Sequence, residues 1–128
     1  MKSRYDRGMD MLKKVDNIHG EKVIATLNAV SPALSQLLAE VFGDIYSRPE
    51  LTLQERELVT LSSLIAQGGC EAQLRVHVNA ALNVGIVPEK IMEVCIHSIY
   101  RISARAERCV YRAGRTERTK RRGIKELY

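Results

Sequence analysis

ERELVTLSSLIAQGGCEAQLRVHVNAALNVGIVPEKIMEV, residues 55–94, carries the signals of three consecutive helices. A capping-box spacing starts the first helix at Thr52, and a glycine pair ends it just after residue 66. The second helix is predicted over 70–84, because apolar residues recur along one side and a glycine follows. Pro88 opens the third, since proline lacks the N–H that would be unpaired in a first turn.

The same helical signals continue upstream of this segment. Apolar spacing predicts an amphipathic helix over 3–17 and a short one over 21–29. Ser31 followed by proline opens a further helix that runs through Phe42, and 46–51 is predicted as a loop. Strand signals are weak, because β-branched residues never alternate for long. We therefore predict an all-α domain, a bundle of about six helices.

Composition places the chain among ordinary globular proteins. Its 128 residues, 45% hydrophobic and 27% charged, suit one domain and are too apolar for a disordered chain. Three widely spaced cysteines argue against a secreted disulfide framework. No apolar run is long enough to span a membrane, and the charged N-terminus is unlike a signal peptide. We therefore expect a cytoplasmic protein that does not bind membranes.

The charge changes abruptly near residue 100. Residues 1–100 hold ten basic and twelve acidic side chains, whereas 101–128 hold ten basic and three acidic ones. We therefore predict a helical domain over 1–100 and an atypical basic tail over 101–128. The tail has a stripe of arginines but little aromatic content and no nucleic-acid-binding motif, so nucleic acid is not expected as a partner.

Three side chains of the central segment could carry chemistry. Cys70 opens a helix, where unpaired N–H groups would lower a thiol pKa, and His77 follows two turns later on the same face. Glu57, near the start of the preceding helix, would lie close to His77 in an antiparallel hairpin, where a carboxylate could orient the imidazole. Taken singly, each also suits a structural role: a surface carboxylate, a structural histidine, and a small buried hydrophobe.

The chain resembles a known family in three places: YDRG at 5–8, FGDIYSRPELTLQERELVTLSSL at 42–64, and QLRVHVNAALNVGIVPEKIMEV at 73–94. These motifs are similar to those of the carboxymuconolactone decarboxylase family, which shares its helical fold with the AhpD alkylhydroperoxidases. The resemblance runs from about residue 4 to 100. It implies an AhpD-like fold and a homo-oligomer, a hexamer built as a trimer of dimers or a trimer.

The resemblance implies two activities for the same residues. The decarboxylase branch removes CO2 from 4-carboxymuconolactone without metal or organic cofactor, and Glu57 and His77 would form its proton-handling pair, with Cys70 lining the pocket. The AhpD branch reduces peroxides with a Cys-x-x-Cys pair, a glutamate and a histidine. Here Cys70 matches the first cysteine, but Gln73 stands at the second, so no internal disulfide can form by that route. Cys95, the other thiol within the resembling region, is predicted to face the core.

The sequence therefore favours a cofactor-independent lyase acting on a lactone acid. Two alternatives stay open: a thiol peroxidase or disulfide reductase with peroxiredoxin-type activity centred on Cys70, and a helical oligomerisation protein without catalysis. The basic tail lacks the Gly-Phe-Pro-like turn and the final helix that the family resemblance implies. If the codons of this segment were read one base later, suitable synonymous codons would encode both the turn and the final helix. We therefore predict a frameshift near Tyr100.

Overall fold

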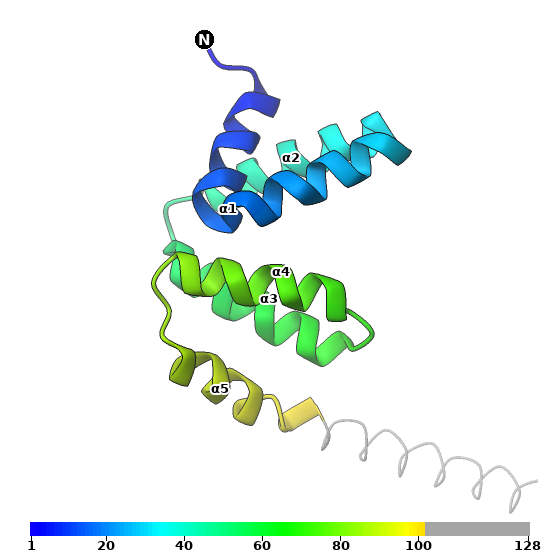
Figure 1. Ribbon diagram of the computed structural model, residues 1–128. Coiled ribbons are helices and arrows are strands. Elements are labelled where there is room, and N and C mark those ends of the chain that lie inside the picture. Colours follow the sequence, from blue (N-terminus) through cyan, green and yellow to red (C-terminus); the bar gives the residue numbers. More distant parts are fainter. Residues whose placement is uncertain (102–128) are drawn as a thin grey trace, which may run out of the picture. The chain divides into compact units, whose positions relative to one another are not determined.

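The computed structural model describes residues 1–101. Its described part is entirely helical, which confirms the predicted fold class. The five helices are α1 (Arg4–Val30), α2 (Pro32–Tyr46), α3 (Leu53–Gln67), α4 (Glu71–Asn83) and α5 (Pro88–His97) (Figure 1). No helix among residues 1–101 is both long and apolar enough to cross a membrane.

The first helix begins where its sequence provides a cap. The Ser3 side chain accepts a hydrogen bond from the Asp6 N–H, and the Asp6 carboxylate accepts one from the Ser3 N–H. Two separate helices were expected over 3–17 and 21–29, but the structure joins them into one element with a break at Asn17. Residues 18–20, expected as a loop around His19, are therefore helical.

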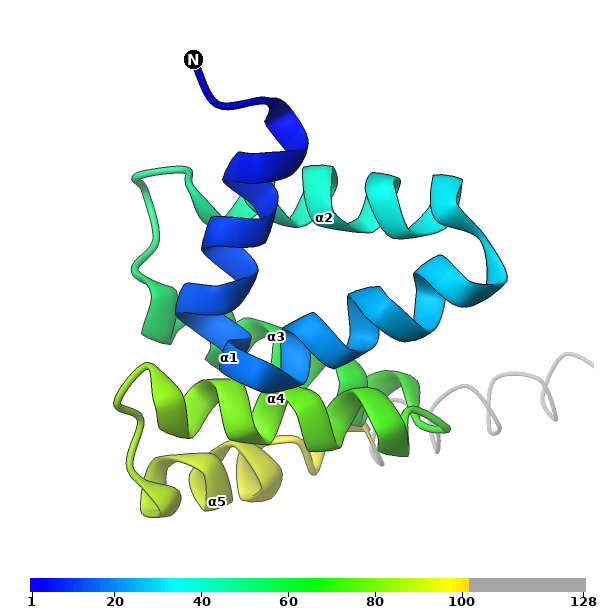
Figure 2. The ribbon, with the colours of Figure 1, turned by 45° about the horizontal axis from the view of Figure 1, so that its top comes forward.

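Helices α1 and α2 lie side by side and approach very closely at one point (Figure 2). A Cβ atom on Gly8 would lie 2.0 Å from the Ala39 carbonyl oxygen, and one on Gly43 would lie 2.6 Å from the Gly8 Cα atom. No real side chain tolerates such distances, so both positions require glycine. This contact fixes the first helix against the second, next to the apolar cluster of Leu12, Ile24 and Ala39.

Helices α3 and α4 form the expected hairpin. Thr52 caps α3 by accepting from the Glu55 N–H, and Gly68, with a φ of 71°, ends it. Leu61 from α3 and Ala81 from α4 meet in a buried cluster, which Ile91 from α5 also contacts. This packing sets the two helices antiparallel, so that the start of α3 lies opposite the later part of α4.

The chain divides into two compact units, Met1–Cys95 and Ile96–Tyr128. Of the second unit the structure describes residues 96–101, where the His97 and Tyr100 rings meet edge to face with centroids 5.2 Å apart. The predictions for the basic tail, its arginine stripe and the frameshift, lie outside the described residues, apart from Arg101.

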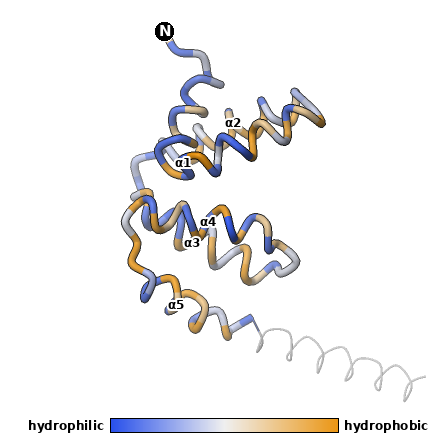
Figure 3. The backbone as a smooth tube through the Cα atoms, viewed as in Figure 1, coloured by the Kyte–Doolittle hydropathy of each residue, from blue (hydrophilic) through white to orange (hydrophobic). Residues whose placement is uncertain are grey.

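Apolar side chains also cover the face of α2 that points away from α1. Ala39, Leu38 and Phe42 pack toward α1, yet further apolar residues of the helix remain exposed. Hydrophobic positions accordingly recur along the whole of α2 (Figure 3). The exposed residues, spaced three or four apart, form what we call the outer α2 face: Leu34, Leu37, Val41 and Ile45.

Candidate active site

A buried carboxylate and an imidazole meet between α3 and α4. Glu57, the fifth residue of α3, is 0% exposed, and its Oε2 atom lies 3.0 Å from Nδ1 of His77 on α4. The His77 side chain is 19% exposed, so the ring also reaches the surface. The hairpin spacing predicted this proximity, and the structure places the two groups in hydrogen-bond contact.

The other oxygen of Glu57 is held from α2. The Tyr46 hydroxyl donates to Glu57 Oε1 at 2.6 Å and also lies 3.1 Å from Thr60 Oγ1. Burial and the hydrogen bond to Glu57 raise the pKa of Tyr46, so the phenol remains a donor. A buried carboxylate is costly unless it is hydrogen-bonded, and here both oxygens are satisfied. Tyr46 and Thr60 thus fix the orientation of Glu57.

The surroundings of His77 favour its charged form. Burial lowers the pKa of the imidazole, but the hydrogen bond to Glu57 and the negative charges of Glu57 and Asp16 raise it. The resulting pKa lies above the ordinary value of 6.5. In the imidazolium, Nδ1–H donates to Glu57, and the second ring nitrogen also carries a proton. The pair is therefore arranged to store a proton near neutral pH.

A third titratable group, Asp16 of α1, completes the cluster and was missed in the sequence. It is 4% exposed, and its Oδ1 atom is buried without a hydrogen-bond partner. Burial raises the pKa of this carboxyl to about 6; the charge of His77 opposes this effect and that of Glu57 adds to it. In the sequence Asp16 looks like any polar residue of an amphipathic helix, and no local signal reveals its burial.

The break in α1 is held by a side chain from α4. Asn17 has a φ of 53° and a ψ of −137°, which interrupts the helical hydrogen bonds. Asn83 Nδ2 donates to the carbonyl oxygens of Lys14, at 3.0 Å, and Val15, at 2.9 Å. In an unbroken helix these carbonyls would accept from residues beyond the break. Asn83 thus fastens the bend directly next to Asp16.

Cys70 is not hydrogen-bonded to this pair. The thiol stands at the N-cap of α4, is 7% exposed, and donates to the Gly68 carbonyl oxygen at 3.4 Å. Seven residues separate it from His77, about 10 Å along a helix axis. Within residues 1–101 no hydrogen bond joins it to Glu57 or His77.

Two positions, 73 and 95, were considered for a second thiol that could form a disulfide with Cys70. Gln73, at the second position of the Cys-x-x-Cys pattern, is exposed. Cys95 was expected to face the core, but it is exposed, and no residue of α5 is buried, so that prediction was wrong. The short α5 covers the end of the core without inserting a fully enclosed side chain. Neither position therefore places a partner thiol beside Cys70.

The cluster also has the composition of a metal site. Asp16, Glu57 and His77 each offer one ligand atom, and these atoms lie within 4.8 Å of one another. Both oxygens of Glu57 accept hydrogen bonds, from Tyr46 and from His77, so two titratable donors already surround this carboxylate. We therefore interpret the three residues as a proton-handling group.

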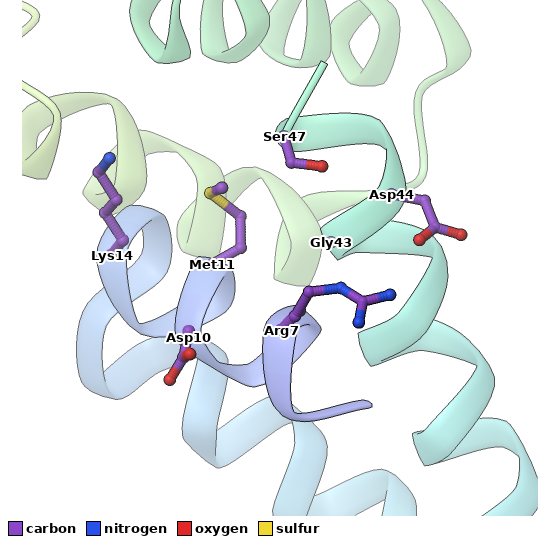
Figure 4. Close-up of a pocket in the computed structure, with 7 residues that line it drawn as sticks. All are labelled: Arg7, Asp10, Met11, Lys14, Gly43, Asp44 and Ser47. Carbon is purple, nitrogen blue, oxygen red and sulfur yellow. The ribbon is translucent and has the colours of Figure 1, made fainter. Parts of the chain in front are cut away.

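Two cavities along α1 adjoin charged side chains, and a third lies beside Tyr5 and Ser35. One of about 340 Å³ adjoins the bend, and its lining includes Asp16, His19, Asn79 and Asn83. The other, of about 260 Å³, lies where α1 and α2 meet and contains both acidic and basic side chains (Figure 4). Its lining consists of Arg7, Asp10, Met11, Lys14, Gly43, Asp44 and Ser47. Of these cavities of the described residues, the first is the one whose lining includes a member of the titratable cluster, Asp16.

Comparisons with known proteins agree on one family. The chain matches the model of the carboxymuconolactone decarboxylase family over residues 32–115, which include Glu57, Cys70 and His77. A 4-carboxymuconolactone decarboxylase from Acinetobacter baylyi is 30% identical over 100 residues, covering 76% of this chain and 74% of that protein. No solved structure matches the chain significantly. The family match extends 15 residues beyond residue 100, into the basic segment.

Proposed function

Because this chain belongs to the carboxymuconolactone decarboxylase family, we propose that it decarboxylates a lactone acid and that His77 and Glu57 handle the proton. The observation that carries the proposal is the 3.0 Å contact between His77 Nδ1 and the fully buried Glu57. The relative from Acinetobacter baylyi is named a 4-carboxymuconolactone decarboxylase, which makes 4-carboxymuconolactone the first substrate to test.

The chemistry requires one acid at the reacting carbon. When the C–C bond to the carboxylate breaks, CO2 leaves and its bonding electron pair stays on the lactone carbon. The His77 imidazolium donates a proton to a carbon of the resulting lactone anion, from the ring nitrogen that does not face Glu57. Glu57 holds the ring orientation and stabilises the cation, while Tyr46 keeps Glu57 in place. This arrangement needs no cofactor to accept electrons.

The test is an assay of lactone loss and CO2 release with the purified full-length chain. His77→Ala and Glu57→Gln should each lower kcat by about 10²- to 10⁴-fold, the usual contribution of general acid–base catalysis. His97→Ala is the matched control, because His97 lies in the other compact unit. Absence of turnover by the unmodified protein, or an unchanged rate in a folded His77→Ala variant, would refute the proposal.

We also propose that the working form is a homo-oligomer, a hexamer or a trimer. The outer α2 face supports this, because four apolar side chains at helical spacing are exposed in the single chain. Association through this face would remove them from water and contribute favourable free energy. A non-catalytic oligomerisation protein would also use the outer α2 face, but that role would not explain the buried Glu57–His77 pair.

A further inference from the structure

Decarboxylation consumes a proton that the Glu57–His77 pair alone does not replace. The balanced reaction takes one lactone carboxylate and one proton to CO2 and the protonated lactone. After each turnover His77 is neutral and must regain a proton from water before it can act again. The proton that is lost comes from the second ring nitrogen, whereas Nδ1 stays hydrogen-bonded to Glu57. Glu57 is 0% exposed and has both oxygens engaged, so it does not return that proton.

Asp16 adjoins both the Glu57–His77 pair and a cavity large enough for several water molecules. One of its carboxylate oxygens lies within 4.8 Å of the ligand atoms of Glu57 and His77. Asp16 is also one of the residues that line the cavity of about 340 Å³ next to the α1 bend. The other polar lining residues, Asn79 and Asn83 among them, provide hydrogen-bonding groups that suit ordered water.

Asp16 also lacks a structural explanation. Its Oδ1 atom is buried and has no hydrogen-bond partner, although an unpaired buried carboxylate oxygen is costly. It makes no ion pair with a lysine or arginine among the described residues. Asp16 also lies outside residues 32–115, which match the family model. A carboxyl kept in such surroundings is typical of a functional group.

We propose that Asp16 is a proton relay that returns a proton from water in the α1 cavity to His77 after each turnover. This rests on the proposed decarboxylation. The Asp16 carboxylate takes up a proton that the solvent delivers through cavity water, and passes it toward the second ring nitrogen of His77, which then becomes the imidazolium again. Asp16 is then a carboxylate once more, so no net change remains on it. It acts through His77 and does not contact the lactone.

The electrostatic surroundings suit this role. Glu57 from α3, His77 from α4 and the Tyr46 hydroxyl from α2 face Asp16, and His19 of α1 lines the cavity beside it. The Asp16 pKa of about 6 lies close to neutral pH, where a relay must both bind and release a proton readily. An ordinary aspartate, with a pKa near 3.8, would rarely be protonated there.

The direct test measures exchange of the His77 ring proton with water by NMR of 15N-histidine-labelled full-length protein. Asp16→Asn should slow this exchange about tenfold or more, since it removes the relay but keeps the shape. Asp10→Asn, the same change at an exposed position of α1, should leave the exchange rate unchanged. An unchanged rate in folded Asp16→Asn would overturn the proposal.

A second variant addresses the cavity itself. Asn79→Leu fills the space with an apolar side chain and leaves Asp16, Glu57 and His77 in place, so exchange should slow there too. If Asp16→Asn does not fold, Asn79→Leu still tests the proposed proton route. A rate equal to that of the unmodified protein in Asn79→Leu would contradict a route through this cavity.

Turnover gives the third readout and separates the two proposals. In Asp16→Ala, kcat should fall and then rise with the concentration of formate buffer, because a small acid can replace the missing carboxyl; a purely structural loss would show no such rescue. Exchange needs no substrate. Absent decarboxylation with Asp16-dependent exchange would refute the proposed function alone, whereas decarboxylation with Asp16-independent exchange would refute only the relay.

Discussion

At the residue scale, the candidate site contains buried ionisable groups, and burying such groups lowers the stability of the folded protein. Glu57 is buried with both oxygens paired, whereas Asp16 is buried with one oxygen unpaired. The two carboxylates lie close together and share one imidazole, which makes their charges interdependent. A cluster of this kind costs free energy of folding, and that cost can be measured.

Replacing Asp16 by its neutral isostere should stabilise the protein above neutral pH. The folded-state pKa of about 6 exceeds the ordinary value of 3.8, so protonation favours the folded state. That stability is complete below about pH 3.8 and is lost as the pH rises through about 6. Asp16→Asn should therefore raise the free energy of unfolding at pH 8 by about 1–2 kcal/mol. Urea denaturation measures this.

The gain should disappear at pH 4, where Asp16 is already neutral in the folded protein. Asp10→Asn, on the exposed side of the same helix, should change the unfolding free energy by less than about 0.5 kcal/mol at both pH values. A destabilised Asp16→Asn at pH 8 would mean that the carboxylate is satisfied in the native protein.

Cys70 provides a test of the thiol alternative. Cys70→Ser should leave lactone decarboxylation within about twofold of the unmodified rate, because the thiol is hydrogen-bonded to Gly68 and not to the Glu57–His77 pair. Peroxide reduction, assayed in the same preparation, is the comparison. Peroxide turnover that is lost in Cys70→Ser would support the peroxidase alternative instead.

Only part of the site could be read from local sequence. The contact between Glu57 and His77 follows from helix spacing and a hairpin, because both residues lie on consecutive helices. Asp16 and Tyr46 could not be found this way, since their burial depends on packing of α1 and α2 against the hairpin. The outcome for Cys95 has the same cause: an apolar pattern does not tell which side of a short helix meets the core.

At the element scale, capping signals gave reliable helix ends and missed one interior feature. The caps predicted at Ser31 and Thr52 both form, because these hydrogen bonds depend only on neighbouring residues. The break at Asn17 was expected as a gap between two helices. The structure keeps the helix on both sides, since Asn83 of α4 supplies the donors that the break requires.

The α1–α2 contact should not tolerate a single added methyl group. Gly8→Ala would place a Cβ atom 2.0 Å from the Ala39 backbone oxygen, so the helices would have to separate. We expect a loss of about 2–4 kcal/mol in unfolding free energy, although alanine has the higher helix propensity. Lys22→Ala, exposed on the same helix, is the control. Equal urea midpoints for the two variants would contradict this packing.

At the scale of the whole molecule, the outer α2 face predicts the state in solution. Light scattering should give a mass several times the 14.4 kDa of one chain. Leu37→Lys combined with Val41→Lys should lower that mass without loss of helix content, because two charges would be buried at the interface. Ser62→Lys, an exposed polar position on α3, is the control. A monomeric unmodified protein would refute the oligomer.

The amide of Asn83 has a consequence for synthesis on the ribosome. It reaches Val15 across 68 positions of the chain, so the bend that seats Asp16 lacks its donor until α4 has left the exit tunnel. A chain that ends before residue 83 would lack the hydrogen bonds from Asn83 to the carbonyl oxygens of the bend, even if α1 had formed. The bend that positions Asp16 therefore cannot be completed before residue 83 has been synthesised.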